Sequence, residues 1–491
     1  MKRLRVILVN VGHRTSTCPA HTPPLGLLYI ASYLRQHRNV DIRVIDQRGE
    51  NAACGSVLER VRSFAPDIVG FRCLSADATL VTECVAGVKS SLRDALVVVG
   101  GPYVSAIGSL VLEAVLGDAA VIGEGELAFE QIAAVVADGD RDFSHIPGLI
   151  WRDAANDIIV NPGTSPVVED LDLLPMPAYD LLDVSIYGRM RNMSMIPWRK
   201  YLALFTSRGC PYQCNYCHHI FGKRYRAHSP ERVAEELEYF SKRFGCRDYD
   251  VVDDVFNLDR RRVLALSKLV RQRGLDVKIA FPNGLRTDIL DAETVNALVD
   301  MGVYASAFAL ESGSPRIQKL VGKNLDIDKF LEGVRLATNR GIFSWGFMML
   351  GFPTETEEEL DTTIRVACQS QLHAGLFFVV TPYAGTELRE MALRTCPERF
   401  EALKLEDSDY VYNFSVNVSA VPDDVLLATV RAAYRRFYVN PRRLLRLVRD
   451  HPAPIQLLEF RKALLRLTRK SSMRETDTPD AFRPHHERWE Q

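Results

Sequence analysis

The sequence lacks several features that would place it in a specialised class of proteins. No apolar run reaches the roughly 20 residues that a membrane span needs, and the apolar start MKRLRVILVN stops at Asn10, too early for a signal peptide. Neither charge is in excess, because 61 Lys and Arg oppose 62 Asp and Glu. This balance excludes an acidic, solvating chain and a protein that coats nucleic acid. We predict a soluble cytoplasmic protein with no membrane partner, and we expect no nucleic-acid partner.

Cysteine is scarce as well. Ten cysteines in 491 residues are too few for a secreted disulfide scaffold. In a reducing compartment they are buried thiols, metal ligands or catalytic groups. Seven stand far apart in the sequence, whereas Cys210, Cys214 and Cys217 form a cluster. This cluster is the most informative feature of the chain.

Residues 1–140 alternate short β-branched runs with amphipathic stretches. The alternation predicts an α/β domain with a parallel, doubly wound, flavodoxin-like sheet, whose ligand lies beyond the carboxyl ends of the strands. No GxGxxG follows the first strand, so a dinucleotide is disfavoured. The residues at the strand ends are the candidate ligand contacts: Pro24, Leu25, Gly26, Arg72, Leu74, Gly100, Gly101, Pro102, Glu124 and Gly125.

The rest of the chain divides into four predicted parts. Proline-rich residues 141–195 indicate a linker. From 196 to 388 the strand–helix alternation resumes in six units, which is typical of a partial (β/α)6 barrel with its chemistry at the C-terminal face. Residues 389–470 predict a mainly helical, basic region, and 471–491 a flexible tail.

Cys210, Cys214 and Cys217 lie on one tight loop after the first strand of this barrel. Four soft ligands would saturate a [4Fe–4S] cluster, so three cysteines leave one iron open to an outside ligand. An open position distinguishes a catalytic centre from a structural one. The alternative is a zinc site completed by His218 or His219, but these residues follow Cys217 immediately, which makes tetrahedral ligation awkward.

The CxxxCxxC spacing in GCPYQCNYC resembles the radical S-adenosylmethionine (SAM) superfamily. The resemblance implies that SAM chelates the open iron and that the reduced cluster cleaves it to a 5′-deoxyadenosyl radical. It also implies an external one-electron reductant such as flavodoxin or ferredoxin. In this chain the matching SAM contacts are Tyr216, Asp253, Asp254, Glu311, Ser312, Met349 and Gly351.

Each of these residues also has an ordinary structural alternative. Asp253 and Asp254 stand where many members carry Gly-Gly-Glu; the carboxylates suit the SAM ammonium, but the glycines are lost. The pair could equally cap the helix that follows, and Glu311 could pair with a surface lysine. The order of all the pieces behind the three cysteines favours the SAM interpretation.

The stretches PPLGLLYIASYLR, VVVGGPYVSA and IGEGE resemble the subgroup that carries a cobalamin-binding domain before the barrel. The resemblance covers about residues 1–385. His13 stands where other cobalamin proteins place the lower cobalt ligand, but the Asp and Gly of their DxHxxG motif are absent. We therefore predict cobalamin without a histidine lower ligand. Arg72 would fill the lower face, or alternatively pair with Asp77.

The resemblance implies a cobalamin-dependent radical SAM enzyme. We expect a C-methyltransferase that methylates an unactivated carbon of a natural product or metabolite through the 5′-deoxyadenosyl radical and methylcobalamin. One alternative is a cyclase, ring-rearranging or oxidising enzyme without methyl transfer. Another is a tRNA or protein methylthiotransferase, whose cysteine pattern Cys18, Cys54 and Cys84 approximate; a third is a non-enzymatic sensor. Candidate substrate contacts are His373, Tyr383 and Asn413.

Overall fold

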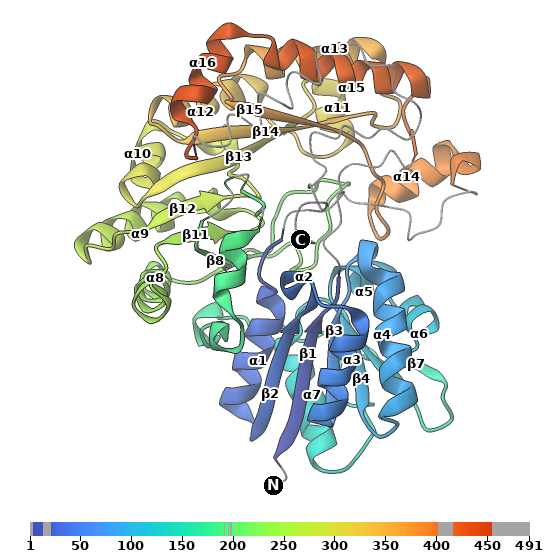
Figure 1. The fold of residues 1–491 in the computed structure, drawn as a ribbon. Helices are drawn as coiled ribbons and strands as arrows, with labels where there is room; N and C mark the ends of the chain where they lie inside the picture. The colour runs from blue at the N-terminus through green and yellow to red at the C-terminus, as the bar shows by residue number, and fades with distance from the viewer. Residues whose placement is uncertain are drawn as a thin grey trace, which may run out of the picture.

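The computed structural model describes residues 3–12, 21–190, 192–194, 196, 199–400 and 416–453. His13, Cys18 and Asn413 lie outside the described residues. The chain forms two α/β units, drawn in Figure 1 with the first below and the second above. No helix among the described residues is long and apolar enough to cross a membrane.

The first sheet has the strand order β2-β1-β3-β4-β5-β6-β7. Its strands are β1 (Leu4–Asn10), β2 (Val40–Asp46), β3 (Ile68–Arg72), β4 (Leu96–Gly100), β5 (Ala119–Val121), β6 (Ile150–Arg152) and β7 (Ile158–Val160). Strands β1 to β5 are parallel in the flavodoxin-like order 2-1-3-4-5, as predicted. Strands β6 and β7 join antiparallel. The sheet therefore extends past residue 140, into the predicted linker.

Helices cover both faces of this sheet because its strands are apolar on both faces. Val6 and Leu8 of β1 belong to one hydrophobic cluster, and Ile7 and Val9 belong to another on the opposite face. The helices are α1 (Leu25–His37), α2 (Gln47–Glu50), α3 (Cys54–Phe64), α4 (Ala78–Ser91), α5 (Pro102–Ile107), α6 (Leu110–Val115) and α7 (Glu126–Ala137). The carboxyl ends of β1 to β5, which we call the cobalamin edge, point towards the second unit (Figure 1).

The second sheet is the predicted six-stranded parallel barrel sheet, in the order β15-β14-β13-β12-β11-β8. Its strands are β8 (Tyr201–Leu204), β11 (Asp248–Val251), β12 (Lys278–Phe281), β13 (Val303–Glu311), β14 (Phe343–Leu350) and β15 (Ala374–Val379). The helices between them are α8 (Pro230–Phe244), α9 (Arg260–Gln272), α10 (Ala292–Asp300), α11 (Pro315–Leu320), α12 (Ile327–Asn339) and α13 (Glu357–Gln369). We call the carboxyl ends of these strands the barrel edge.

Local sequence signals account for the helix boundaries of this unit. The Ser229 side chain accepts a hydrogen bond from the Arg232 amide, Pro230 occupies the first helical position, and Gly245 ends α8 in the left-handed conformation. Thr356 and Glu359 form a reciprocal capping box at the start of α13.

A short antiparallel ribbon stands after β8. It pairs β9 (Ser207–Arg208) with β10 (Arg226–Ala227), and Arg208 lies opposite Arg226. The ribbon closes residues 209–225, which we call the cluster loop because they carry Cys210, Cys214 and Cys217.

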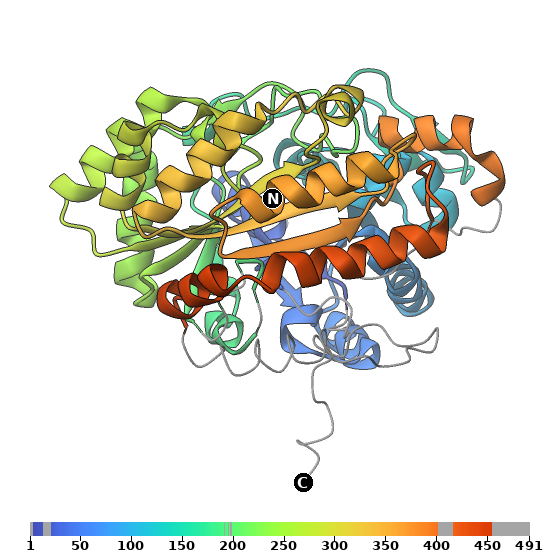
Figure 2. The same ribbon diagram turned by 90° about the horizontal axis from the view of Figure 1, so that it is seen from above.

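Helices α14 (Glu387–Thr395), α15 (Asp423–Tyr438) and α16 (Pro441–Asp450) complete the described chain. Figure 2 shows α15 along strand β15, the edge of the second sheet. The Tyr438 hydroxyl bonds both the amide and the carbonyl of Gly375, at 3.0 Å each. The Tyr434 hydroxyl does the same at Phe377, at 3.2 and 3.3 Å. The backbone groups of Gly375 and Phe377 on β15 are therefore satisfied by side chains.

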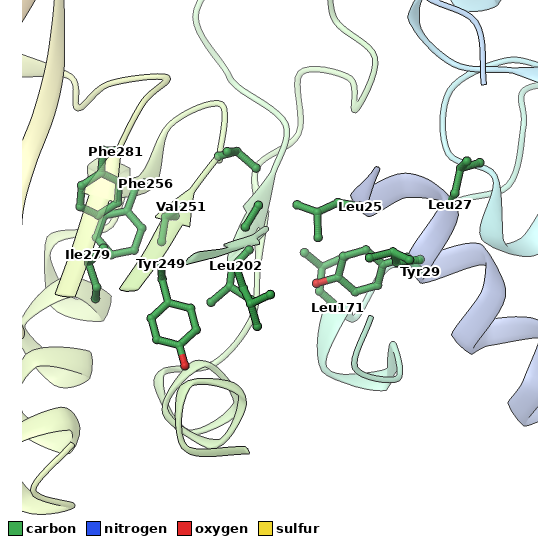
Figure 3. Packing of buried hydrophobic residues seen from close by; sticks show 14 of the residues in the cluster. Leu25, Leu27, Tyr29, Leu171, Leu202, Tyr249, Val251, Phe256, Ile279 and Phe281 are labelled. Carbon is green, nitrogen blue, oxygen red and sulfur yellow. The ribbon is translucent and has the colours of Figure 1, made fainter. Parts of the chain in front are cut away.

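The two units share one hydrophobic core. Leu25, Leu27 and Tyr29 of α1 belong to the same cluster as Leu202 and Tyr249 of the barrel, with Leu171 between them (Figure 3). In addition, the Tyr179 hydroxyl donates to the Ala203 carbonyl at 2.7 Å. The cobalamin edge and the barrel edge are thus held facing each other by packing.

Candidate active site

The cluster loop is shaped by a glycine and an aspartate. Gly209 has φ of +83°, and a Cβ there would lie 2.2 Å from the Arg224 carbonyl oxygen, so only glycine fits. Its amide donates to the Asp254 carboxylate at 3.0 Å. Asp254, at the end of β11, therefore touches the loop next to Cys210. A predicted SAM contact and the predicted cluster ligands are brought together.

The three thiols differ in exposure: Cys214 is buried, Cys210 is half-buried and Cys217 is exposed. Burial among protein groups raises the pKa of the Cys210 thiol, and it raises the pKa of Cys217 to about 12 with help from Cys214 and Glu311. Binding of a metal cluster would require these thiols to lose their protons. Three closely spaced cysteines on one loop are the ligand set of an iron–sulfur cluster with one open iron.

Among the described residues, no three His, Cys, Asp or Glu side chains converge to hold a single metal ion. The cysteines of an iron–sulfur cluster bind different iron atoms, so they do not need to converge on one point. On the outside of the loop, the Arg286 guanidinium lies 3.7 Å from the centre of the Tyr212 ring. This contact from the end of β12 fixes the loop in place.

Three of the other predicted SAM contacts gather beside the cluster loop. Tyr216 and Met349 pack against one hydrophobic cluster, and the Tyr216 ring lies 6.0 Å from that of Phe352. Gly351 has φ of +96°, and its amide donates to the buried Glu355 carboxylate at 2.7 Å. The turn after β14 is thereby held against the loop from below.

Glu311 is a strained residue at the barrel edge. It has φ of +62°, which is uncommon for a residue with a side chain, and it ends a register shift between β13 and β14. Its carboxylate pairs with Lys323 at 3.2 Å. Strain of this kind, of order 1–3 kcal/mol, is concentrated at functional sites. Lys323 is itself buried, so the predicted alternative of a surface lysine is wrong in that detail.

Two predicted SAM contacts have structural roles instead. The Asp253 carboxylate is buried and accepts hydrogen bonds from the Thr206 amide, the Thr206 hydroxyl and the Ser207 hydroxyl, at 2.6 to 2.7 Å. Both of its oxygens tie β11 to the end of β8. The Ser312 hydroxyl is also buried, 3.2 Å from the Thr363 hydroxyl and accepting from the Ser314 amide.

Asp254 is therefore the carboxylate of the pair that faces outwards. It is exposed, yet surrounding protein raises its pKa to about 6, with the neighbouring Asp253 as a smaller cause. At neutral pH it is mainly ionised and can accept from an ammonium group.

The cobalamin edge has one backbone position that a side chain would block. Gly101 has φ of +104°, and a Cβ there would lie 2.9 Å from the Cys73 carbonyl oxygen. Gly100, by contrast, would place its Cβ in ordinary contact distance of β5. Pro102 occupies the first position of α5. The Gly-Gly-Pro turn after β4 thus lies close to the loop that follows β3. The half-buried Leu74 is part of that loop.

The start of α1 is open on one side. Pro24 precedes the helix and Leu25 is buried in the shared core, whereas Gly26 is exposed and has no atom within 4 Å of where its Cβ would be. Open backbone at the carboxyl edge of a doubly wound sheet suits a large flat ligand. The predicted cobalamin contacts at Pro24, Leu25 and Gly26 stay a prediction that this open backbone favours.

Arg72 lies at the centre of the cobalamin edge. Its guanidinium donates to the Asn10 side chain at 2.9 Å, while Asp77 pairs with Arg48 at 2.7 Å. Because His13 lies outside the described residues, the absence of a histidine lower ligand stays a prediction.

Sequence reasoning missed a buried polar network behind Arg72. The Asp46 carboxylate accepts from Asn10 at 2.7 Å and from the Tyr187 hydroxyl at 2.6 Å, and it lies 2.8 Å from Nε2 of His21. Burial alone would raise the pKa of Asp46, but these hydrogen bonds outweigh it and hold the pKa at about 2. The only signal in the sequence is a polar residue at a strand end.

Two further cobalamin candidates serve the contact between the units. Glu124 is buried and pairs with Arg208 at 2.7 Å and with Arg226. A Cβ on Gly125 would lie 2.6 Å from the Ile30 side chain, so this glycine permits packing of α7 on α1. Both residues thus have a role in the contact between the units, and their predicted contact with cobalamin stays a prediction.

His373 is not placed to touch a substrate. It precedes β15 and so lies at the end of the sheet opposite the barrel edge, fully buried. Its Nδ1 accepts from the Ser344 amide at 2.9 Å, and its Nε2 lies 3.1 Å from the Asp450 carboxylate. The predicted substrate role is wrong; this histidine fastens α16 to the sheet.

Tyr383 lies beside the cluster loop, and its predicted substrate contact stays a prediction. Its ring centre is 5.8 Å from that of His218 in the cluster loop. Two residues later, a Cβ on Gly385 would lie 2.8 Å from the Ala106 carbonyl oxygen of α5. The loop after β15 therefore runs between the cysteines and the first unit.

With this geometry in place, two family models match the chain. The B12 binding domain model matches residues 14–133, and the Radical SAM superfamily model matches residues 204–367. The first covers strands β2 to β5 of the doubly wound sheet, and the second covers the barrel from the end of β8 into α13.

The chain is also similar to known proteins over most of its length. It is 31% identical to an uncharacterized methyltransferase, PH0819, of Pyrococcus horikoshii, over 87% of this chain and 90% of that one. It is 24% identical to the anaerobic magnesium-protoporphyrin IX monomethyl ester cyclase of Rubrivivax gelatinosus, over 89% and 78%.

Among solved structures, the cobalamin-dependent SAM radical enzyme OxsB, with aqua-cobalamin and SAM bound, superposes with a TM-score of 0.73 at 16% identity, covering 94% of this chain and 72% of that one.

The chain belongs to the cobalamin-dependent radical SAM enzymes. The predicted family, fold class and cofactors (a [4Fe–4S] cluster, SAM and cobalamin) are confirmed. Of the predicted activities, methyl transfer is the one that the relatives support best.

Proposed function

We propose that this enzyme methylates an unactivated carbon of a small molecule, a natural product or metabolite. When bound, SAM on the cluster supplies the 5′-deoxyadenosyl radical that removes a hydrogen atom, and cobalamin supplies the methyl group. The observation that carries the proposal is the placement of the cluster loop against the cobalamin edge, with the loop of Tyr383 between them.

The residues divide the work by position. Cys210, Cys214 and Cys217 would hold the cluster, and the carboxylate of Asp254 would accept from the SAM ammonium next to Cys210. Tyr216 offers an aromatic face near the turn after β14. Each of these groups would bind and orient a cofactor and so position the reacting atoms. This role does not require any of them to act as an acid or a base.

The first unit would hold cobalamin by shape more than by charge. Gly26 and Gly101 leave backbone uncovered, and the guanidinium of Arg72 is held in place by Asn10. An arginine has no free lone pair, so it can fill the lower face without binding cobalt.

Ring closure without methyl transfer is the second candidate, because the cyclase of Rubrivivax gelatinosus aligns with 89% of this chain. The two reactions leave different products of SAM. Methyl transfer yields S-adenosylhomocysteine together with 5′-deoxyadenosine for each product molecule. Ring closure or oxidation yields 5′-deoxyadenosine alone.

The test is anaerobic reconstitution with iron, sulfide and cobalamin, followed by reduction with flavodoxin, ferredoxin or titanium(III) citrate. The enzyme is then incubated with SAM carrying a deuterated methyl group and a small-molecule extract. We expect both SAM products in equal amounts and one or more metabolites that gain the deuterated methyl group. If 5′-deoxyadenosine forms without S-adenosylhomocysteine, the methyltransferase proposal is wrong.

A cytoplasmic location stays a prediction.

A further inference from the structure

Buried charged residues join the two ends of the cluster loop to the first unit. Arg208 and Arg226 face each other across the β9–β10 ribbon, at the two ends of the loop. Both reach the turn between β5 and α7: Arg208 pairs with Glu124 and with Glu126 at 2.7 Å each, and Arg226 also pairs with Glu124. We call these four residues the interdomain charge cluster.

All four members are buried, with exposed fractions of 4% and 3% for Glu124 and Glu126, and 2% and 7% for Arg208 and Arg226. Two positive and two negative charges balance within the cluster. Buried charges of this kind are tolerated only in a fixed geometry, because any separation leaves one of them without a partner and without water. The cluster is therefore rigid.

Further contacts hold Arg208 and Arg226 in place against the first unit. The Arg208 guanidinium lies between two rings, 5.1 Å from Tyr29 of α1 and 5.2 Å from Phe221 of the cluster loop. Arg226 also donates to the Val168 carbonyl at 2.6 Å. The loop that carries the three cysteines is thereby fastened to α1, to α7 and to the segment between the units.

The charge cluster also lies at the edges that carry the cofactors. Glu124 follows β5 at the cobalamin edge, and Arg208 stands two residues before Cys210. The ion pair of Arg208 with Glu124 therefore links the start of the cluster loop to the turn after β5. We propose that Glu124, Glu126, Arg208 and Arg226 are positioning residues that fix the distance between the iron–sulfur cluster and cobalamin, so that radical formation and methyl transfer occur on the same substrate molecule. This inference rests on the proposed function.

The variant that tests it is Glu124→Gln, which keeps the shape of the side chain and removes the charge shared by both arginines. The control is Glu169→Gln. Glu169 pairs at 2.6 Å with Arg224 of the same loop, but the two side chains are 60% and 74% exposed. An exposed pair contributes little to structure.

The measurement is the distance between cob(II)alamin and the reduced cluster in the anaerobic holoenzyme, obtained by pulsed electron paramagnetic resonance. We expect Glu124→Gln to bind iron and cobalamin as the wild type does and to give a distance distribution at least about twice as broad. Glu169→Gln should match the wild type. Loss of cobalamin from Glu124→Gln, or an unchanged distribution, would overturn the inference.

Two further measurements keep the inference testable if Glu124→Gln does not fold. Glu126→Gln removes a carboxylate that bonds only one of the arginines and should broaden the distribution less. In the wild type, the distribution should not change between low salt and 1 M KCl, because buried pairs are poorly screened. Broadening of the wild-type distribution by salt would contradict a buried, rigid cluster. These distances require no turnover, so an enzyme that failed to methylate would sink the proposed function and leave this test intact.

Discussion

The cobalamin edge and the barrel edge are both carboxyl ends of parallel sheets, but they differ in how far their polar side chains are exposed. At the barrel edge, Asp254 remains exposed next to the cluster loop and Cys217 remains exposed within it, although Asp253 is buried. At the cobalamin edge, Asp46, Asp77 and Glu124 are buried in hydrogen bonds or ion pairs. We therefore expect the barrel edge to bind through side chains and the first unit to bind through backbone and shape. A metal cluster needs ligand atoms, and a large planar cofactor needs room.

The largest effect should come from removing a ligand at the barrel edge. Cys214→Ala is expected to lower reductive SAM cleavage to the background rate, because the cluster loses one of its three thiolates. Cobalamin binding should persist, since it belongs to the other edge. Iron content, 5′-deoxyadenosine and the cobalamin absorption spectrum measure the three properties. Cys396→Ala, in a half-buried cysteine outside the cluster loop, is the control and should retain cleavage.

A smaller effect is expected from closing space at the cobalamin edge. Gly101→Ala places a Cβ 2.9 Å from the Cys73 carbonyl oxygen, which forces the turn apart. We expect cobalamin to bind about tenfold more weakly, a loss of about 1.4 kcal/mol, while SAM cleavage continues. Equilibrium titration with hydroxocobalamin measures the affinity.

Gly108→Ala is matched to this variant, since Gly108 also has a positive φ, of +61°, but has no atom within 4 Å of its Cβ position. Both substitutions carry the same kind of backbone strain. Equal losses of affinity in the two variants would show that strain, and not the lost space, weakens binding.

The effect furthest from the catalytic step should be a change in acid stability from the polar network of the first unit. The folded-state pKa of Asp46 is lowered to about 2 from 3.8, so its ionised form contributes about 2 kcal/mol at neutral pH. This contribution is present above pH 4 and is lost as the pH falls towards 2. Asp46→Asn should therefore be less stable at pH 7 and should lose less stability on acidification.

Urea unfolding across this pH range measures the difference in the free energy of unfolding. Asp180→Asn removes an exposed pair with Arg35 in the same part of the molecule and serves as the control. If Asp46→Asn follows the wild-type pH dependence, the network does not hold the charged form.

The parallel order of β1 to β5 and of the second sheet could be predicted from the sequence, because alternation of strands and helices allows few parallel topologies. The antiparallel addition of β6 and β7 could not. The cluster site could be predicted because the spacing of Cys210, Cys214 and Cys217 fits few other kinds of site. The sequence did not show which of Asp253 and Asp254 is free to contact SAM. Adjacent residues beyond a strand point in opposite directions, and only the fold shows which one meets Thr206. The buried contacts of Glu124 and His373 could not be predicted for a related reason: their partners, Arg208 and Asp450, are 84 and 77 residues away.

The tyrosine hydroxyls on β15 have a consequence for how the chain behaves in solution. The exposed border of an open sheet is a template on which another chain can add a strand. Tyr434 and Tyr438, one helical turn apart, bond the backbone groups of Gly375 and Phe377 on that border. A fragment ending before Asp423 would leave these groups without their partners, and we expect it to self-associate through this border. Helix α15 thus protects the border against the addition of a strand.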